Sequence, residues 1–493
     1  MDDGEPLIEE ARRRIAEAAT DGRTELDLAG LGLRELPEEL FALTGLESLL
    51  LGIPKPGGAP VPGGTILPNN RLASLDPRVC TTFTRLRQLD LTSNKLTSLP
   101  REIGALTALE FLFVGQNKLE ALPVEIGNLQ ALQKVSLLDN RLTTLGTGIC
   151  ACASLVLLDA RSNSTLGGLP DEIGNLAALE ELYLTHSPFG ILPASVGRLS
   201  KLRILQLDNT QLTALPPEIG NCVLLRDLSA GVNRLKALPP EIGWLTNLET
   251  LDISANAIAM LPREIGRLTS LKLLNAGSGN TIVSVPEEIG QLHALEILEL
   301  GSNPITELPA SIGKLANLTR LALTGCQVAA FPPEIGGLTS LTELFMEGNP
   351  ITVLPDEIGN CAELQSVSMV NTGLTALPRT IGKLKKLVNL EVLQHQIASL
   401  PDEIGGLSAC QSLKIAGGPL TALPATIGDL AALTSLDVGS NALTELPREL
   451  GKLTLLTSLS VEGNLLDVPP PEVVAQGTQA MLEFLRNLPT PRA

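Results

Sequence analysis

A unit of 23 residues recurs along most of this chain of 493 residues. The segment LTSLP at residues 96–100 returns as LEALP at residues 119–123, 23 positions later. Alignment on the first leucine gives nineteen units of the form LxxLxLxxNxLxxLPxEIGxLxx; most spacings are 23 residues, two are 24 and one is 40. Because no single unit can bury its own leucines, such a chain must stack its units into a solenoid.

The letters of the unit predict its local structure. The leucines of LxLx alternate with polar residues, which is the period of a short strand with one buried face. The following Asn, present in twelve units, ends the strand and satisfies backbone groups at the bend. Ser, Thr, Cys or His at this position can still donate a hydrogen bond, whereas Leu31 and Gly418 cannot, so we expect looser turns there. Pro then prevents further strand pairing, because it has no backbone N–H to donate. EIGxL forms one outer 3₁₀ or α turn, and its Gly stands where a side chain would crowd the bend.

Both ends of the array have helical spacing, as expected of caps that cover the terminal cores. We therefore expect an N-terminal helical cap over residues 1–22, about nineteen repeats over residues 23–470, and a C-terminal capping helix and tail over residues 471–493. The apolar stripe of the second helix comprises Val473, Val474, Gly477, Met481, Phe484, Leu485 and Leu488.

One unit is interrupted by a stretch rich in proline and glycine, GIPKPGGAPVPGGTILP, at residues 52–68. This composition cannot pack a core and indicates an exposed loop inserted into the array. A proline-motif ligand is the alternative, although the stretch lacks P-x-x-P spacing.

The charge and the cysteine positions of the chain limit the kinds of partner and the cellular compartment that we expect. The net charge of −18 argues against nucleic acid and anionic membrane, and favours a partner protein with a basic patch. No run of eighteen apolar residues is present, and the charged N-terminus does not resemble a signal peptide. All seven cysteines substitute at positions of the repeat, which predicts reduced, buried thiols and a cytoplasmic protein.

The sequence contains no known arrangement of catalytic or metal-binding residues. The three histidines, His186, His293 and His395, fall in different units, and the sequence has no HExxH, GxxxxGK[S/T] or GxSxG motif. Cys150 and Cys152 resemble a thiol pair, but they occupy the Gly and Leu positions of EIGxL. We expect no enzyme activity, no cofactor and no metal site.

Side chains between the strand leucines should line the concave face, where binding is expected. Of the seventeen residues before the last strand leucine, from the third unit on, six are acidic and one is basic. Aromatic residues are only 2% of the chain, so two groups of exposed apolar residues are candidate hot spots. The first patch comprises Phe111, Phe113, Leu157, Tyr183 and Ile204 with His186 at its rim, and the second comprises Phe345 with Glu343, Glu347 and Glu391.

Each candidate surface has a plainer interpretation. Scattered apolar residues are normal on a large surface, so either patch can be incidental. Trp244, the only tryptophan, lies in the convex column of EIGxL, where it covers neighbouring prolines or forms a second binding spot.

The unit LPxEIGxLxxLxxLxLxxNxL is identified as a leucine-rich repeat, which implies a horseshoe with a parallel sheet on its concave face. It resembles the intracellular repeats of Ras-group scaffolds and of Roco proteins. The flanks EEARRRIAEAATDGRTELDLAGLGLRELPEEL and PPPEVVAQGTQAMLEFLR look like the borders of a Roco-type repeat domain. In that family a GTPase domain follows, whereas this sequence reaches Ala493 without a phosphate-binding loop.

These features lead us to expect a scaffold that binds a partner protein on its concave face, with a role in intracellular signal transduction. The alternative is a stand-alone regulatory or effector repeat module that acts on a GTPase or kinase supplied by another chain. The small GTPase or kinase partner is implied by the resemblance alone.

Overall fold

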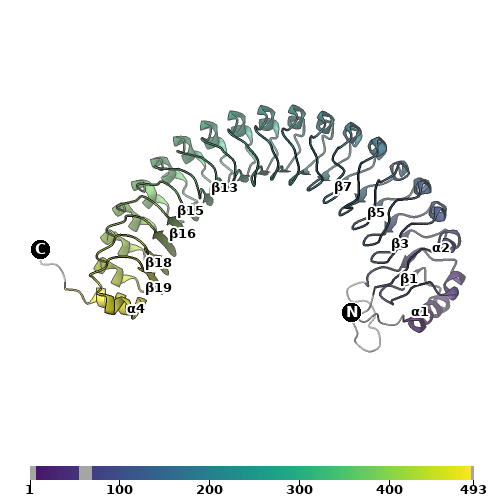
Figure 1. Ribbon diagram of the computed structural model, residues 1–493, viewed down its shortest axis with the longest axis horizontal. Coiled ribbons are helices and arrows are strands. Elements are labelled where there is room, and N and C mark those ends of the chain that lie inside the picture. The colour runs from purple at the N-terminus through teal and green to yellow at the C-terminus, as the bar shows by residue number, and fades with distance from the viewer. Residues whose placement is uncertain (1–6, 55–68, 490–493) are drawn as a thin grey trace. The chain divides into compact units, whose positions relative to one another are not determined.

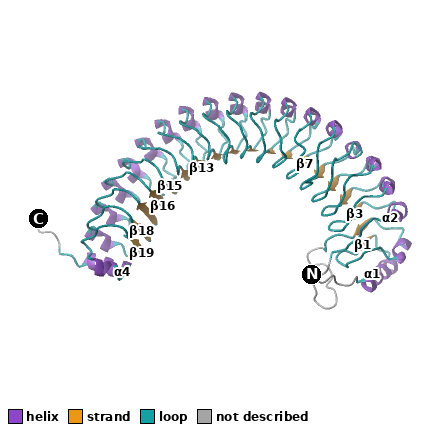
Figure 2. Ribbon diagram, viewed as in Figure 1, coloured by secondary structure: helices purple, strands orange, loops and turns teal. Residues whose placement is uncertain are grey.

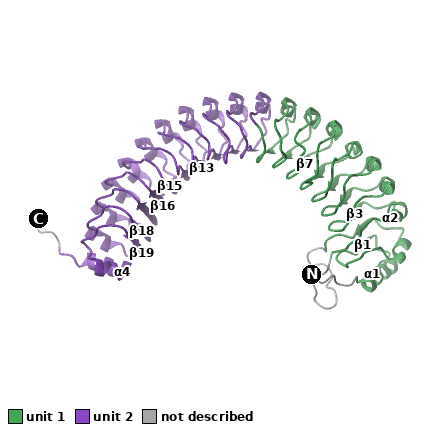
Figure 3. Cartoon of the chain, viewed as in Figure 1, with its two compact units in different colours: residues 1–235 green, residues 236–493 purple. Residues whose placement is uncertain are grey.

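The computed structural model describes residues 7–54 and 69–489. The chain divides into two compact units, Met1–Leu235 and Lys236–Ala493 (Figure 3). The predicted loop at residues 52–68 lies outside the described residues except for its first three positions.

Unit 1 is a stack of coils behind an N-terminal helix, α1 (Ile8–Asp21), which buries Ala11, Ile15 and Ala18. Each coil contributes one short strand and one outer helical turn (Figure 1). The strands are β1 (Glu25–Asp27), β2 (Ser48–Leu50), β3 (Gln88–Asp90), β4 (Phe111–Phe113), β5 (Lys134–Ser136), β6 (Leu157–Asp159), β7 (Glu181–Tyr183), β8 (Ile204–Gln206) and β9 (Asp227–Ser229). The outer turns are η1 (Glu38–Ala42), α2 (Pro77–Thr82), η2 (Arg101–Ala105), η3 (Val124–Asn128), η4 (Ile149–Ala151), η5 (Asp171–Asn175), η6 (Ala194–Arg198) and η7 (Pro217–Asn221).

Unit 2 has the same construction and ends in two short helices, α3 (Pro471–Val474) and α4 (Thr478–Arg486). Its strands are β10 (Thr250–Asp252), β11 (Leu273–Asn275), β12 (Ile297–Glu299), β13 (Arg320–Ala322), β14 (Glu343–Phe345), β15 (Ser366–Val370), β16 (Asn389–Leu393), β17 (Ser412–Ala416), β18 (Ser435–Asp437) and β19 (Ser458–Ser460). Its outer turns are η8 (Pro240–Trp244), η9 (Arg263–Arg267), η10 (Glu287–Gln291), η11 (Ala310–Lys314), η12 (Pro333–Gly337), η13 (Asp356–Asn360), η14 (Arg379–Lys383), η15 (Asp402–Gly406), η16 (Ala425–Asp429) and η17 (Arg448–Lys452).

The core lies between the strands and the outer turns of each unit. In the third coil Leu86, Leu89, Leu91 and Leu96 are all fully buried, and equivalent leucines are buried in the following coils. Neighbouring strands pair in parallel, and each residue lies opposite the equivalent residue of the next repeat; Leu89, for example, pairs with Leu112. The strands form the inner face of each unit and the helical turns its outer face (Figure 2). The predicted fold class, an α/β repeat solenoid with a parallel sheet and helical caps, is confirmed.

The C-terminal cap differs from its predicted form in one respect. A single helix was expected through Gly477, but Gly477 has φ of +89° and precedes α4 as a separate helix. The buried residues of α4 are Met481, Leu482 and Leu485, so Leu482 replaces the predicted Phe484 on the inner side. A glycine in the left-handed region favours a break between helices, which the helical spacing alone did not indicate.

Asparagine side chains tie each coil to its neighbour, as the ladder position predicted. Asn94 donates from Nδ2 to the carbonyl of Leu91 in its own coil at 3.0 Å and to that of Leu51 in the preceding coil at 3.0 Å. Its Oδ1 accepts from the backbone N–H of Leu72 at 3.0 Å. One amide therefore satisfies three buried backbone groups, and Asn163, which carries a glycosylation sequon, is fully buried in the same role.

Substitutes for Asn behave in two different ways. Ser187, Thr210 and Cys326 donate to the carbonyls of Ala160, Leu207 and Leu300 at 3.0, 2.7 and 3.3 Å, and their coils keep three-residue strands. Three consecutive substitutes, Thr372, His395 and Gly418, make no such bond within the described part of the chain. The prediction that Thr372 and His395 donate here is wrong: Thr372 Oγ1 has no partner, and His395 Nδ1 accepts from Ile397 N–H at 3.0 Å.

The three coils of unit 2 that lack the donor have longer strands. β15, β16 and β17 each span five residues where other strands span three. Without a side-chain amide that donates to the backbone carbonyls, these strands continue to pair with each other for two more residues. Val370 lies opposite Leu393, and Leu393 lies opposite Ala416. In unit 2 the absence of the donor therefore accompanies strands of five residues, whereas in unit 1 the coil of Leu31 also lacks the donor and its strand β1 keeps three residues.

His395 and Gly418 form a matched pair in adjacent coils. The imidazole is 1% exposed and its Nε2 has no hydrogen-bond partner in the structure. A Cβ on Gly418 would lie 2.3 Å from the imidazole Cε1, so the ring occupies the place of a side chain in the next coil. Burial lowers the pKa of His395 from its ordinary 6.5.

His395→Asn is expected to stabilise unit 2 and to flatten its acid sensitivity. The folded state holds His395 neutral while the unfolded chain is protonated below pH 6.5, so stability is full above pH 6.5 and falls as pH drops toward the lowered pKa. Asn removes the unpartnered nitrogen and restores a donor, which should raise the free energy of unfolding by about 1 kcal/mol near neutral pH and by more in acid. Denaturant unfolding at several pH values checks this; an unchanged pH dependence in the variant would contradict it.

The glycine of the EIG segment is required because the next coil, rather than the bend of its own turn, leaves no room for a side chain. A Cβ on Gly174 of η5 would lie 2.2 Å from the backbone oxygen of Ser195 in the next coil. The glycine prediction thus holds, but its cause is stacking between coils, because coils this close leave no room for a methyl group.

Candidate functional site

The first patch lies on the strand face of unit 1 and falls into two parts. Phe111 and Phe113 occupy β4, and both are half-buried. On β6 to β8, Tyr183 stands diagonally between Leu157 and Ile204, all of them half-buried. Between the two parts lies β5, where Lys134 pairs with both Phe111 and Leu157, and Ser136 pairs with Phe113. His186 is exposed in the loop after β7, with φ of +59°.

A polar network fixes Tyr183. Its hydroxyl donates to Glu181 Oε2 at 2.7 Å, and the guanidinium of Arg161 lies over its ring at 5.2 Å from the centroid. Arg161 in turn binds Asp159 through Nε and Nη2, each at 2.9 Å. Because two charged partners hold the ring in one orientation, Tyr183 presents a fixed surface.

Sequence reasoning did not single out Arg161 or Asp159. Arg161 lies two residues beyond Asp159, just past the end of β6, and the strand positions alone were considered. A signal was present, because Arg161 is the basic residue in a column that holds Thr92, Gly115 and Leu138 in the preceding coils.

Titration of Tyr183, the only tyrosine, should report on this network. Its pKa is raised to about 12, first by burial and then by the hydrogen bond to Glu181. We expect the tyrosinate absorbance to rise with a midpoint near 12, and Glu181→Gln to lower that midpoint toward the ordinary 10. Far-ultraviolet circular dichroism over the same range shows that the chain is still folded. A midpoint near 10 in folded wild-type protein would contradict the network.

The second patch contains the same combination of arginine, aromatic ring and carboxylates. Arg320 of β13 lies over the ring of Phe345 at 4.7 Å from the centroid. It binds Glu299 through Nε and Glu343 through Nη1, both at 2.6 Å. Glu343 is therefore already engaged with Arg320.

A hollow of about 290 Å³ opens on the strand face beside Phe345. Phe345, Glu347 and Glu391, which were predicted as members of one patch, all line it, whereas Glu343 does not. Glu391 accepts from Lys414 Nζ at 3.1 Å and from Ser368 Oγ at 3.3 Å. The remaining lining side chains are mostly small and polar, and include Ser366, Asn389 and Ser412.

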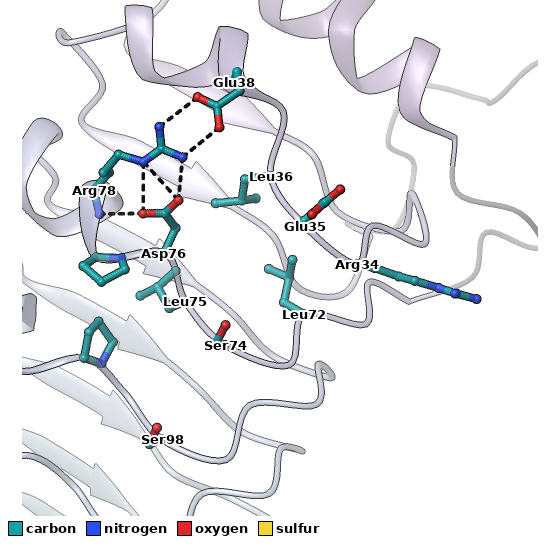
Figure 4. Close-up of a pocket in the computed structure, with 12 residues that line it drawn as sticks. Arg34, Glu35, Leu36, Glu38, Leu72, Ser74, Leu75, Asp76, Arg78 and Ser98 are labelled. Atoms are coloured by element: carbon teal, nitrogen blue, oxygen red, sulfur yellow. Dashed lines mark hydrogen bonds and ion pairs between the residues drawn. The ribbon is translucent and has the colours of Figure 1, made fainter.

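A larger hollow, of about 530 Å³, lies in unit 1 on the flank of the first coils (Figure 4). Arg78 lies between Glu38 and Asp76, to which it donates at 2.8–3.3 Å, and Arg34 points away from this cluster (Figure 4). Hydrogen bonds from Arg78 hold the pKa values of Asp76 and Glu38 below their ordinary range. Arg78 also lies over Phe41, at 4.1 Å. Because Arg78 of α2 is bound to Glu38 of η1 and to Asp76 within the protein, we interpret this cluster as a clamp between η1 and α2.

The remaining candidates for chemistry have the properties of core residues. All seven cysteines are free and buried, as predicted. Burial raises the pKa of the thiols, to about 12 for Cys150 and about 11 for Cys152, so they are held as neutral thiols. Among residues 7–54 and 69–489, no group of three or more His, Cys, Asp or Glu side chains is placed to hold a metal ion.

Two further surface features bear on binding. No helix in the described ranges has the length and apolar character needed to cross a bilayer. Trp244 is 49% exposed at the end of η8 and stays a predicted alternative contact.

The chain is similar to known repeat proteins over most of its length. Residues 81–189, 191–281 and 278–349 match the family described as leucine-rich repeat region, and residues 340–361 match leucine rich repeat. The first family covers more than half of the chain. This protein therefore belongs to the leucine-rich repeat family.

Solved structures agree with this assignment. A leucine-rich repeat protein of Leptospira interrogans is 33% identical, with a TM-score of 0.66, over 83% of this chain and 97% of that one. YopM from Yersinia enterocolitica is 25% identical, with a TM-score of 0.64, over 94% and 92%. The ectodomain of the Arabidopsis thaliana receptor kinase GASSHO1/SCHENGEN3, solved in complex with CASPARIAN STRIP INTEGRITY FACTOR 2, is 30% identical, with a TM-score of 0.68, over 88% of this chain and 52% of that one. This chain thus spans about half of that ectodomain. No curated protein sequence matches the chain.

Proposed function

We propose that this protein is a non-enzymatic scaffold that binds a partner protein through the concave strand face of its repeats. The observation that carries the proposal is the ordered aromatic surface on that face, where Arg161 holds Tyr183 and Arg320 holds Phe345. Aromatic and arginine side chains that are fixed before binding lose little entropy on association, and they dominate protein interfaces.

Charge favours a partner with a basic patch. The chain carries a net charge of −18, and acidic side chains recur along the strand columns. We place the protein in the cytoplasm, in signal transduction, with a small GTPase or kinase as the expected partner by analogy with Roco and Ras-group repeats. A regulatory module acting on such a partner in another chain is the alternative form of the same proposal.

Similar proteins support binding as the activity. The GASSHO1/SCHENGEN3 ectodomain was solved with a bound partner, so a leucine-rich repeat array of related sequence binds a polypeptide. A non-enzymatic role is consistent with this, because the family acts by surface recognition.

Site-specific photo-crosslinking in native extract tests the proposal. A benzophenone amino acid is placed either at Phe113 on β4 or at Val124 on η3, which is 67% exposed on the outer face of the same coil. We expect a discrete crosslinked protein from position 113 and none from position 124. Crosslinking from position 124 alone would contradict binding on the concave face.

A further inference from the structure

The hollow on β14 to β17 has the shape and charge to receive a single long basic side chain. We propose that it binds an arginine side chain of a partner polypeptide. This inference rests on the proposed function, since it names a feature of the partner that the concave face would recognise.

The hollow extends along one row of side chains on the sheet. Phe345 on β14 and Lys414 on β17 form its ends, three strand steps or about 14 Å apart. Ser368 and Glu391 lie between them in the same row, and the small polar side chains of Ser366, Asn389 and Ser412 line the hollow beside this row. This length suits one extended side chain.

Phe345 offers a surface that an arginine prefers. Arg320 lies over the ring from β13 but does not line the hollow, whose residues come from β14 to β17 and the residues that follow β14. A second guanidinium stacked on the ring from the hollow would repeat the contact that the protein already makes within itself. Arg320 does not repel it strongly, because Glu299 and Glu343 neutralise its charge.

The charges that line the hollow are net negative. The lining holds two carboxylates, of Glu347 and Glu391, and one lysine, Lys414, which is paired with Glu391 at 3.1 Å. Glu347 accepts a hydrogen bond from Thr324 Oγ1, and a carboxylate retains further acceptor sites after one such bond. Glu347, in the same coil as Phe345, is therefore the carboxylate to which a guanidinium stacked on Phe345 would donate, in a charge-assisted hydrogen bond.

The same coils depart from the repeat in their backbone. Thr372, His395 and Gly418 replace the Asn of the ladder in the coils of β15, β16 and β17, and these are the strands of five residues. Buried polar atoms without partners, on Thr372 and His395, accompany them. When residues depart from the repeat consensus and leave buried polar groups without hydrogen bonds, a functional site is the expected reason.

Saturation-transfer NMR on the full chain tests the proposal with two matched probes. N-acetyl-arginine amide and N-acetyl-citrulline amide have nearly the same shape, but only the first is charged. We expect transfer to the arginine methylene protons and little transfer to citrulline. Equal transfer to both probes, or to neither, would overturn the assignment.

Variants locate the bound probe. Phe345→Ala and Glu347→Gln should each weaken arginine binding about tenfold, the usual loss for one charged hydrogen bond or stacking contact. Glu334→Gln on η12, which removes the same charge from the outer face, should leave it unchanged. Lys414→Met should strengthen binding by freeing Glu391, whereas a hollow that recognises carboxylates through Lys414 would lose its ligand.

The two proposals fail separately. Loss of arginine selectivity together with retained crosslinking from position 113 would remove the hollow as a site and leave binding on the concave face intact. Absence of crosslinking from position 113 with retained arginine selectivity would remove the first patch as the contact and leave the hollow as a site.

Discussion

Gly174→Ala is expected to lower the free energy of unfolding of unit 1 by about 1–3 kcal/mol, as overpacking commonly does. The added methyl group would lie 2.2 Å from the backbone oxygen of Ser195, and a backbone atom cannot rotate away as a side chain can. Relief requires the coils of η5 and η6 to separate, which loosens the stack on both sides. Denaturant unfolding followed by circular dichroism measures the change.

Gly168→Ala in the same coil is the matched control. A Cβ there meets no atom within 4 Å. We expect little change, or a gain of about 0.4–1 kcal/mol from reduced freedom of the unfolded chain. Equal destabilisation by both substitutions would show that coil spacing does not explain the glycine at the outer turn.

Phe113→Ala combined with Tyr183→Ala is expected to weaken partner binding about a thousandfold. Each aromatic residue acts as a hot spot worth about 2 kcal/mol, and the two lie three strand steps apart, so their losses should nearly add. Titration calorimetry with the partner identified by crosslinking measures the loss. Thermal unfolding should change little, because both rings stand on the strand face and neither is part of the buried core.

Two comparisons make this result specific. Tyr183→Phe removes the hydrogen bond to Glu181 but keeps the ring, so it should retain most of the affinity if stacking dominates. Val124→Ala on the outer turn should retain all of it. Undiminished binding by the double variant would remove the first patch as the binding surface.

The period of the sequence was sufficient to predict the architecture. Leucines at fixed spacing must face inward together, so Leu86, Leu89 and Leu91 are buried as expected. The Asn column was predictable for the same reason, because Asn94 and Asn163 meet the same backbone groups in each coil.

The repeat period could not reveal the side-chain contacts that form when coils stack on one another. The pairing of Arg161 with Asp159 and Tyr183 depends on side chains from β6 and β7 that meet only after register is established. Thr372 keeps a hydroxyl but finds no partner, whereas Thr210 finds one at 2.7 Å, and residue type does not distinguish them. The clash that excludes a side chain at Gly418 comes from His395, one coil away.

The placement of the candidate side chains on the strands was therefore predictable, but their contacts were not. Phe345 and Glu391 were named from the strand columns and share one hollow, while Glu343 is held by Arg320 outside it. Phe111 and Leu157 were grouped together, although Lys134 separates them on the sheet.

Hydrogen–deuterium exchange of the full chain, with and without the partner identified by crosslinking, tests the central claim most directly. Peptides that contain the inner strands β4 to β8 can be compared with peptides from the outer turns η3 to η7 of the same coils. Protection of the strand peptides and their following loops, with unchanged outer turns, is the predicted result. Protection confined to the outer turns would contradict recognition through the concave face.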